Sequence, residues 1–514
     1  MSAMVRRRSG VGTMARRIGL MVGIVLLAQS VEAQFAQQGS SLVGGGTVGP
    51  TPSQGNAVAI SADGNTIVVG GPGDALNTGA AWVFTRRDGA WSQQGLKLVG
   101  SGAAGGAEQG WSVAISADGG TAIVGGPADS GFTGAAWVFA RSAGGWSQQG
   151  AKLAPSDAVD AAEFGAAVAL SADGDTAIVG GEGDDSQIGA AWVFTRSGGR
   201  WSQQGSKLTG FDAVGSSWQG WSVGLSADGN TAVVGGYQDD LGVGAAWVFA
   251  RNGAAWLQVG AKLVGTGVAG STVEQGRAVA ISADGSTVVS GGDGDDGGAG
   301  AAWIFSRGGG GWPQQGGKLV GSGAAGDAAQ GRAVAVSADG ATAVVGGPAD
   351  AGGAGAAWVF TRTGEAWSPH GGKLVGGGGP AAQGTAVAIS ADGATVVVGG
   401  PRQYWTGAAW VFVSPACAPS ITTQPHGRRA ASGEAVTLAV AASGSAPLSY
   451  QWYEGEPGDT STPVGSGSGS LTTPPLTAST SFWVRVGNGC GHADSEPAAI
   501  TVGDAPRPRL RRAG

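Results

Sequence analysis

At 514 residues the chain is long enough for two or three domains, or for one large repeat array with an appendage. Its 103 glycines follow no Gly-X-Y period, which excludes collagen. Only 13% of the residues are charged and the net charge is −7, so the chain lacks the basic footprint that nucleic acid or an anionic membrane requires. Frequent alternating runs of alanine, valine and isoleucine favour many short strands joined by glycine turns.

Residues 1–33 have the features of an export signal peptide. Five arginines come first, an apolar run follows at 18–28, and Val31-Glu32-Ala33 forms a cleavage pattern. The run is too short to cross a bilayer comfortably and no second candidate exists, so we expect a soluble mature chain without membrane insertion. Removing the signal leaves 24 basic and 35 acidic residues, a net charge of −11. This predicts a secreted, periplasmic or cell-surface protein, which we expect to be a monomer.

A unit of about 55 residues repeats seven times between residues 34 and 414. In the first unit, residues 57–61 alternate and lead into Asp63-Gly64, a hairpin signal in which both residues are expected to take positive φ. Residues 65–71, 79–86 and 91–98 supply three more strands. Four antiparallel strands per unit, with nothing helical between them, predict an all-β fold, a seven-bladed β-propeller.

Residues 34–44, QFAQQGSSLVG, are an isolated copy of the fourth-strand sequence and precede the first full unit. Tryptophans begin the fourth strands of the first six units, at Trp91, Trp146, Trp201, Trp256, Trp312 and Trp367. The seventh unit passes into Ser414-Pro415 without a fourth strand. Because an open strand edge at the seam is a liability, we predict that residues 34–44 complete the last blade, with Phe35 in the tryptophan position.

The unit at 163–196, EFGAAVALSADGDTAIVGGEGDDSQIGAAWVFTR, resembles the FG-GAP repeat, the blade of integrin α-subunit propellers. Phe164-Gly165 stands at that family's Phe-Gly, and Gly70-Gly71-Pro72 stands at its Gly-Ala-Pro. The resemblance covers residues 35–414, and kelch propellers are the nearest alternative because they share the double glycine and the tryptophan. It implies an integrin-like propeller of adhesion type.

The resemblance does not extend to calcium. Integrin-like blades carry it in a loop spaced Asp-x-Asp-x-Asp-Gly, whereas the loop here is Ser-Ala-Asp-Gly, with one carboxylate. Calcium needs about six to eight oxygen ligands. We therefore expect each aspartate to hold its own hairpin turn, and we predict no cofactor and no metal.

Residues 417–503 resemble a bacterial immunoglobulin-like domain, through SGEAVTLAVAASGSAPLSYQWYEG and LTASTSFWVRVGNGCG. Trp452 occupies the third-strand position where such domains bury a tryptophan. In this fold Cys417 and Cys490 fall at the same end of the sandwich, so an oxidising compartment favours a disulfide between them over a reactive thiol. Residues 504–514 are expected to form a disordered basic tail.

Catalytic patterns are scarce in this sequence. His370, His426 and His492 are too few and too scattered for a zinc site. No nucleophile elbow, phosphate loop or dinucleotide fingerprint stands out among the glycines. We expect the repeated tryptophans to pack between blades rather than to form a sugar-binding ladder. We expect the fourth-strand lysines to guard outer edges, at Lys97, Lys152, Lys207, Lys262, Lys318 and Lys373.

One face of the propeller varies from unit to unit, because the loops joining strands 2 to 3 and 4 to 1 are long and irregular there. Binding residues gather on loops that a rigid scaffold holds. Where the channel opens, the units carry Asn56, Trp111, Ala166, Trp221, Arg277, Arg332 and Thr385. The variable loops add Phe132, Trp218, Tyr237, Tyr404 and Trp405. Beside these lie the carboxylates Asp74, Asp129, Asp184, Asp185, Asp239, Asp240, Asp295, Asp296 and Asp350.

Exposed aromatic residues beside carboxylates suit a carbohydrate or protein ligand, and loop packing with solubilising charge is an equal alternative. Three function classes follow from this pattern. The first is a secreted or cell-surface binding or adhesion protein, without enzymatic activity, that uses the variable face. The second is a polysaccharide-acting enzyme with paired carboxylates at the channel mouth. The third is a purely structural envelope protein. Resemblance rather than chemistry favours the first class.

Overall fold

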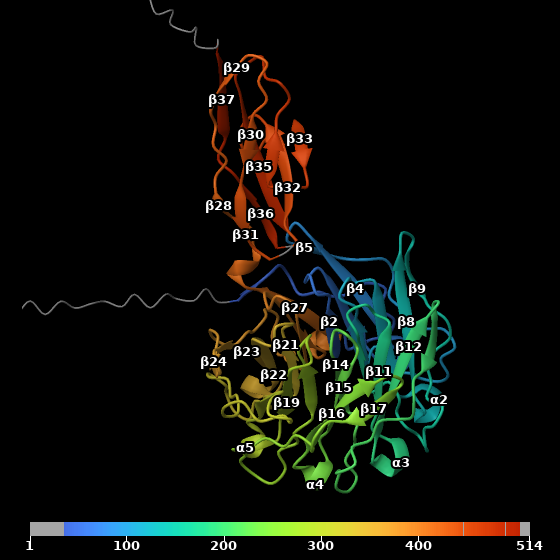
Figure 1. Ribbon diagram of the computed structural model, residues 1–514. Helices are drawn as coiled ribbons and strands as arrows, with labels where there is room; N and C mark the ends of the chain where they lie inside the picture. Colours follow the sequence, from blue (N-terminus) through green and yellow to red (C-terminus); the bar gives the residue numbers. More distant parts are fainter. Residues whose placement is uncertain (1–34, 446, 489, 504–514) are drawn as a thin grey trace, which may run out of the picture. The chain divides into compact units, whose positions relative to one another are not determined.

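The computed structural model describes residues 35–445, 447–488 and 490–503. The predicted signal peptide at 1–33 and the predicted tail at 504–514 lie outside these residues. The described residues form seven small antiparallel sheets, followed by the sheets of a sandwich-like domain (Figure 1). The prediction of a seven-bladed β-propeller with a C-terminal immunoglobulin-like domain is confirmed.

Blade 1 shows how burial selects the residues of each strand. Its strands pair antiparallel in chain order from the channel outward, as β2 (Ala57–Ile60), β3 (Thr66–Gly71), β4 (Ala80–Arg87) and β5 (Ala90–Gln93). β3 is buried along its whole length, which explains its nearly continuous apolar run. Its Gly70 is required by packing, since a Cβ atom there would collide with the carbonyl oxygen of Gly110 in the next blade.

The other blades repeat this strand order. Blade 2 consists of β6 (Ser112–Ile115), β7 (Thr121–Gly126), β8 (Ala135–Ser142) and β9 (Gly145–Gln148). Blade 3 consists of β10 (Ala167–Leu170), β11 (Thr176–Gly181), β12 (Ala190–Ser197) and β13 (Arg200–Gln203). Blade 4 consists of β14 (Ser222–Leu225), β15 (Thr231–Gly236), β16 (Ala245–Asn252) and β17 (Ala255–Gln258). Blade 5 consists of β18 (Ala278–Ile281), β19 (Thr287–Gly292) and β20 (Ala301–Ser306). Blade 6 consists of β21 (Ala333–Val336), β22 (Thr342–Gly347), β23 (Ala356–Thr363) and β24 (Ala366–Pro369).

Blade 5 departs from the prediction of a fourth strand beginning at Trp312. Its outer segment makes only isolated bridges, which join Phe305 to Gln314, Gly308 to Gly311 and Ala302 to Leu319. Pro313 follows the tryptophan where the first four units have serine or leucine, and proline has no N–H to donate to a ladder. The segment therefore keeps the position of a strand without its regular pairing.

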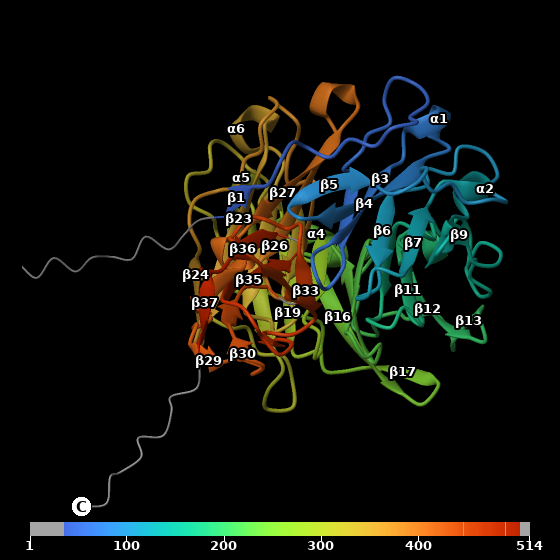
Figure 2. The same ribbon diagram turned by 90° about the horizontal axis from the view of Figure 1, so that it is seen from above.

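The N-terminal segment completes blade 7, as predicted. This blade consists of β25 (Ala386–Ile389), β26 (Thr395–Gly400), β27 (Ala408–Val413) and β1 (Ala36–Gln37), and β1 lies beside β27 (Figure 2). Ala36 pairs with Val413, and Leu42 exchanges backbone hydrogen bonds with Ala409 at 2.7 and 3.1 Å. The innermost strands contact one another around the whole ring, including β25 with β2. The ring is thus closed by pairing the two ends of the repeat array.

The Ser-Ala-Asp-Gly segments are hairpins, but their turn differs from the expected one. In blade 1 only the glycine has positive φ, 69° at Gly64, and Asp63 does not. The N–H of Gly64 donates to the carbonyl of Ser61 (2.9 Å), as in a type I turn followed by a left-handed glycine. Oδ1 of Asp63 accepts the Ser61 hydroxyl (2.5 Å) and the Asn65 N–H (3.0 Å). Each aspartate of this kind therefore holds its own turn.

The alanines of these turns join the blades in a ring that the sequence analysis missed. The alanine N–H of each blade donates to the alanine carbonyl of the next at 2.9–3.0 Å. The ring runs through Ala62, Ala117, Ala172, Ala227, Ala283, Ala338 and Ala391 and returns to Ala62. Seven backbone hydrogen bonds between blades thereby supplement the packing of side chains.

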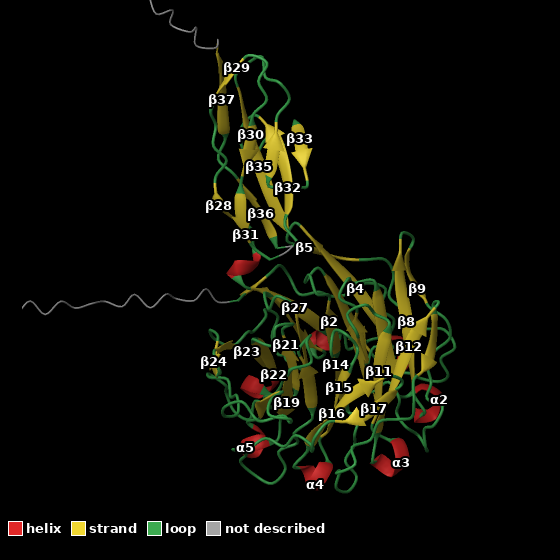
Figure 3. Cartoon of the chain, viewed as in Figure 1, coloured by secondary structure: helices red, strands yellow, loops and turns green. Residues whose placement is uncertain are grey.

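Short helical turns follow the second strands and gather at one face of the propeller (Figure 3). They are α1 (Asp74–Asn77), α2 (Asp129–Phe132), α3 (Asp184–Gln187), α4 (Asp239–Gly242), α5 (Asp295–Gly298), α6 (Asp350–Gly353) and the 3₁₀ turn η1 (Gln403–Trp405). Their central residues are left-handed, for example Leu76 with φ 58° and ψ 49°. None of the helices in the described part of the chain is long and apolar enough to cross a membrane.

The third-strand tryptophans form the cores between blades, as predicted. Each is at most 3% exposed, at Trp82, Trp137, Trp192, Trp247, Trp303, Trp358 and Trp410. The ring nitrogen of Trp82 donates to the carbonyl of Gly45 (2.8 Å), so its polar atom is satisfied. A fourth-strand tryptophan such as Trp146 bonds the preceding blade, through Gln94 (3.1 Å). The tryptophans therefore stabilise the ring and leave no sugar-binding ladder.

The C-terminal domain is built from two small strand pairs and one larger sheet. A short 3₁₀ turn, η2 (Pro415–Cys417), comes first. The small pairs are β28 (Ser420–Thr423) with β31 (Ala441–Ser443) and β30 (Thr437–Ala439) with β34 (Ser470–Thr472). The larger sheet contains β29 (Arg429–Ala431), β37 (Ala498–Gly503), β35 (Thr480–Asn488), β32 (Ser449–Glu454), β33 (Pro463–Ser466) and β36 (Gly491–Asp494). Trp452 is fully buried, and a disulfide joins Cys417 to Cys490, as predicted.

Candidate ligand-binding site

Three positions in each blade surround the end of the channel on the variable face. The mouth position directly precedes the innermost strand and is occupied by Asn56, Trp111, Ala166, Trp221, Arg277, Arg332 and Thr385. The rim position lies three residues earlier and is occupied by Ser53, Glu108, Glu163, Trp218, Glu274, Ala329 and Ala382. The wall position follows the Gly-Gly pair of the second strand and is occupied by Pro72, Pro127, Glu182, Tyr237, Asp293, Pro348 and Pro401.

One tight turn holds the rim and mouth residues of each blade. Every rim residue is left-handed, with φ between 54° and 60°. The N–H of the mouth residue donates to the rim carbonyl, for example from Trp111 to Glu108 (3.0 Å). Residues other than glycine adopt this conformation at a cost of about 1–3 kcal/mol, and such residues cluster at binding sites. The scaffold thus presents two side chains per blade at the channel end.

A cavity of about 940 Å³ opens at the mouth, toward blades 6, 7, 1 and 2. Three of its four rim residues are short, at Ser53, Ala329 and Ala382, and its wall residues include Pro72, Pro348 and Pro401. Because these side chains are small or compact, they leave the space open. The volume is in the range of small-molecule sites, which are typically about 300–1,000 Å³.

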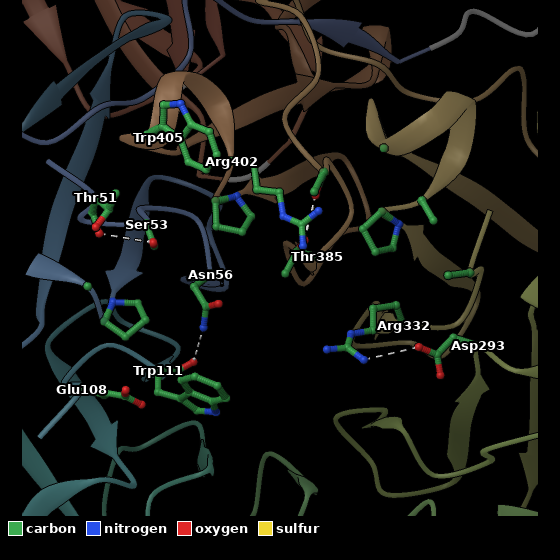
Figure 4. A pocket seen from close by; sticks show the side chains of 18 of the residues that line it. Thr51, Ser53, Asn56, Glu108, Trp111, Asp293, Arg332, Thr385, Arg402 and Trp405 are labelled. Atoms are coloured by element: carbon green, nitrogen blue, oxygen red, sulfur yellow. Dashed lines mark hydrogen bonds and ion pairs between the residues drawn. The ribbon is translucent and has the colours of Figure 1, made fainter. Parts of the chain in front are cut away.

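The side chains with recognition chemistry in the cavity come from different blades (Figure 4). They are Asn56, Glu108, Trp111, Asp293, Arg332, Thr385, Arg402 and Trp405. Trp111 is 37% exposed and Trp405 is 72% exposed. Asn56 is oriented by its amide, which donates to the carbonyl of Trp111 (3.0 Å). The cavity therefore combines indole faces with polar and charged groups.

A plug of large side chains fills the mouth on the side of blades 4 and 5. The ring centroid of Tyr237 lies 4.9 Å from that of Trp221 and 5.3 Å from that of Trp218. The guanidinium of Arg277 lies 4.1 Å from the Tyr237 ring centroid and 4.6 Å from the Trp221 ring centroid. Cation–π contacts of this kind stabilise by roughly 1–2 kcal/mol when they are desolvated. Because the plug fills the side of blades 4 and 5, the cavity lies on the opposite side of the channel end.

Acidic residues pack behind and beside the plug. Burial raises the pKa of Glu182 well above its usual value, and the neighbouring Glu163 raises it further. Its Oε2 atom is buried without a hydrogen-bond partner in the described structure. Burial, and then Asp293, also raise the pKa of Glu274. Two pairs of carboxylates, Glu163 with Glu182 and Glu274 with Asp293, therefore lie close together at the mouth.

The tips of the left-handed turns differ in height around the mouth. Large apolar side chains stand exposed on them in blades 1, 2, 4 and 7, at Leu76, Phe132, Leu241, Tyr404 and Trp405. The tips of α5 and α6 carry glycines instead, and Gly352 and Gly353 line the cavity. Space around these two glycines is open. The cavity is thus bounded by a tall side and a low side.

Two segments of the chain match known protein families. Residues 146–194 match the FG-GAP repeat. Residues 417–503 match the Ig-like domain CHU_C associated. Among curated proteins, none matches the sequence significantly. These two matches and the disulfide indicate an extracellular protein of adhesion or binding type.

Three solved structures illustrate what parts of this chain are similar to. Hydrazine synthase of Kuenenia stuttgartiensis is 13% identical, with a TM-score of 0.46, over 73% of this chain and 99% of the other. The β-propeller domain of the trilobed protease of Pyrococcus furiosus is 9% identical, with a TM-score of 0.37, over 67% and 90%. Titin M4 is 17% identical, with a TM-score of 0.15, over 17% and 98%.

The propeller distributes the predicted site residues among three places. Trp111, Arg332 and Trp405 line the cavity, Trp218, Trp221, Tyr237 and Arg277 form the plug, and Phe132 and Tyr404 stand on exposed tips outside it. Tyr237 is only 6% exposed, so the expectation of an exposed aromatic residue is wrong there. Arg277 and the two plug tryptophans cover it.

The loop aspartates of the blades correct a second expectation. Six of them are buried rather than exposed beside a ligand, at Asp74, Asp129, Asp184, Asp239, Asp295 and Asp350. Each forms an ion pair with a lysine of its own blade, at Lys97, Lys152, Lys207, Lys262, Lys318 and Lys373. The expectation that these lysines guard outer edges is therefore wrong. In addition, Oδ1 of Asp74 accepts the N–H of Val48 (2.7 Å), which ties the incoming loop to the pair.

Two patterns in the sequence could have predicted the ion pairs and the plug. The aspartate and its lysine are always 23 residues apart, and blade 7 replaces them with Gln403 and Ser41. The wall position is proline in four blades but Glu182, Tyr237 and Asp293 in three consecutive ones. Glu108 and Arg402 were also missed. Nowhere in the described residues do three His, Cys, Asp or Glu side chains gather as a metal site would require.

Proposed function

We propose that this chain is an extracellular binding protein that holds carbohydrate in the cavity at the propeller mouth, without turning it over. The observation that carries the proposal is the meeting of Trp111 and Trp405 with polar side chains around one cavity. A pyranose ring offers an apolar C–H face and a rim of hydroxyl groups. An indole packs against the first, and amide, hydroxyl and guanidinium groups hydrogen-bond the second.

The dimensions of the site favour a small ligand or one segment of a chain over a folded partner. A stable protein–protein interface buries about 800 Å² on each partner. The recognition groups here surround a concave space of about 940 Å³ instead. A concave site with a few convergent polar groups is typical of small-ligand binding.

The experiment is co-sedimentation of the mature chain with insoluble polysaccharides, with the supernatant assayed for released sugar. We expect binding without release. Trp111→Ala and Trp405→Ala should each reduce the bound fraction. Phe132→Ala and Tyr404→Ala are matched controls, since both residues are exposed on the same face but lie outside the cavity. Failure to bind any polysaccharide, or equal loss in the controls, would contradict the proposal.

A second candidate is a polysaccharide-acting enzyme, which one observation favours. Glu182 is buried, its pKa is raised, and it faces the carboxylate of Glu163. Glycosidases use one carboxylic acid kept protonated near neutral pH beside a second carboxylate. Release of sugar that Glu182→Gln abolishes while binding persists would establish this second function.

A further inference from the structure

The cavity has two chemically different sides. Figure 4 shows Glu108 and Trp111 on one side of the cavity, Arg332 beside Asp293 on the facing side, and Arg402 next to Thr385. The arginines come from the mouth position of blade 6 and from the residue after the wall proline of blade 7. In the other blades the residue beside the wall position is glycine, alanine or glutamine. Two guanidinium groups from adjacent blades that line one cavity are therefore a local feature and not part of the repeat.

Most of the donors of these arginines are unused. Arg332 has one contact with a carboxylate, from Nη1 to Oδ2 of Asp293 at 3.4 Å. The same Asp293 oxygen also faces Nε of Arg277 at 3.8 Å, so one carboxylate serves two cations. Arg402 is exposed, and its guanidinium makes no hydrogen bond or ion pair with a residue that the structure describes, although its backbone N–H donates to the carbonyl of Ala381 (3.1 Å). A guanidinium carries five N–H donors in a planar fork, so several remain for a ligand.

We propose that the saccharide held in this cavity is acidic, and that Arg332 and Arg402 bind its anionic group. The proposal rests on the carbohydrate-binding function proposed above and names the ligand class. The planar fork of arginine matches a carboxylate or a sulfate with two parallel hydrogen bonds. Trp111 and Trp405 pack against the sugar rings, and Asn56 and Thr385 contribute amide and hydroxyl groups.

The low side of the cavity lies next to the arginines. Gly352 and Gly353 at the tip of α6 belong to the same blade as Arg332. The equivalent positions of blade 1 carry Leu76 and Asn77, whose side chains stand above the loop. Since glycine leaves this path free, a polysaccharide chain can enter the cavity beside Arg332 and continue outward.

General electrostatic attraction does not explain binding of a polyanion to this protein. The chain carries a net charge of −7, which opposes the approach of an acidic polymer. Selective binding of acidic saccharides must therefore come from a local site. Removal of a cavity arginine can therefore be compared with removal of a positive charge elsewhere on the protein.

The test measures affinity by calorimetry for polygalacturonate, its methyl ester, dextran sulfate and unmodified dextran. The first pair isolates the carboxylate and the second pair isolates the sulfate. We expect tight binding of at least one acidic polymer and at least tenfold weaker binding of its uncharged counterpart. Arg402→Gln should weaken binding of the acidic polymer by about tenfold, because a charge-assisted pair is lost.

Two further variants separate recognition from folding and from net charge. Arg332→Lys keeps the charge but removes the planar fork, and we expect it to weaken binding as well. Arg307→Gln removes one exposed positive charge from the opposite face and should leave the affinity unchanged. Equal effects of Arg307→Gln and Arg402→Gln would overturn the inference.

The outcomes distinguish this inference from the function on which it rests. Binding of neutral polymers that depends on Trp111, with no preference for the charged members of each pair, would overturn the acidic ligand and leave carbohydrate binding in place. Binding of no polymer in this panel or in the co-sedimentation panel would overturn both. A preference for polygalacturonate over dextran sulfate, or the reverse, identifies the anionic group.

Discussion

Nζ of Lys207 lies 2.5 Å from Oδ2 of Asp184, and the Asp184 side chain is fully buried. The other carboxylate oxygen of Asp184 accepts the N–H of Val159 at 2.6 Å. One buried carboxylate thus joins the left-handed turn α3, the outer strand segment and the loop that enters the blade. The same ion pair recurs in six blades, so it is a structural element of the propeller.

Replacing Lys207 with alanine should destabilise the propeller by about 3–5 kcal/mol, because it leaves a buried carboxylate without its partner. Guanidinium denaturation of the variant measures the loss. Asp185→Asn is the matched control, because Asp185 is the adjacent residue and is exposed. We expect the control to change the free energy of unfolding by less than about 0.5 kcal/mol.

The double variant Asp184→Gln with Lys207→Ser installs in blade 3 the residues that blade 7 carries, Gln403 and Ser41. It removes both charges together, so no buried charge is left unpaired. We expect it to be more stable than Lys207→Ala alone. A double variant as unstable as the single one would show that the lysine contributes mainly through packing.

The N-terminal segment that pairs with β27 in blade 7 should contribute as much to stability as the fourth strand of another blade. Leu42 and Leu98 are 6% and 5% exposed and occupy equivalent positions in blades 7 and 1. Each substitution to alanine should cost about 2–5 kcal/mol, since both leave a cavity in a core. Denaturation of the two variants compares them directly. A negligible cost at Leu42 alone would show that the N-terminal segment contributes little to closure.

Deleting residues 34–44 is the stronger form of the same experiment. It removes β1 and exposes the edge of β27. We expect a sharply lower melting temperature or aggregation, measured by calorimetry and light scattering. An unchanged melting curve would contradict the closure of the ring by this segment.

The disulfide of the C-terminal domain should contribute about 4 kcal/mol in the chain-entropy model, because it closes a long loop. Its two cysteines are 73 residues apart in sequence. Calorimetry of the full chain with Cys417→Ser and Cys490→Ser should show one transition moved to lower temperature. The transition of the propeller serves as the internal reference, and we expect it to stay in place.

Stability should fall with rising pH because of Glu182. Burial, and then Glu163, raise its pKa in the folded state, while Arg277 opposes the shift. The stability that the protonated form contributes is fully present below the unfolded pKa and is lost as the pH rises through the folded pKa. Glu182→Gln stays neutral, so its free energy of unfolding should fall less than that of the wild type over this interval.

Denaturation curves recorded between about pH 4 and pH 8 measure this difference. Glu365→Gln is the control, because Glu365 is exposed on an outer hairpin. We expect it to follow the wild-type profile. Parallel profiles for Glu182→Gln and the wild type would show that the pKa of Glu182 is the same in the folded and unfolded states.

Local patterns predicted most of the architecture. The alternation of β2, the continuous apolar run of β3 and the aspartate–glycine turn are set by neighbouring residues, so they can be read in one unit and counted along the chain. The stranded segment at 34–44 could be placed because its partner strand was missing at the other end. The disulfide could be predicted because the immunoglobulin-like fold brings its cysteines to one end.

The binding site was predicted only in outline. Trp111 and Arg332 were correctly placed at the mouth, and Trp405 was expected on a variable loop and lines the same cavity, but Tyr237 and the six paired aspartates were expected on the surface and are buried. An aspartate and a lysine 23 residues apart meet only after four strands have formed. The turn type was also wrong, because aspartate–glycine fits more than one hairpin geometry.

The sequence by itself determined the number of blades, their strand order and the closure of the ring, because these depend on short-range periodicity repeated seven times. Only the tertiary structure decided which mouth residues form a plug and which leave a cavity. Arg277 of blade 5 covers Tyr237 and Trp221 of blade 4, whereas the proline walls of blades 6, 7 and 1 leave space. Those contacts join side chains that the closed ring brings together from distant parts of the chain, and no local pattern contains them.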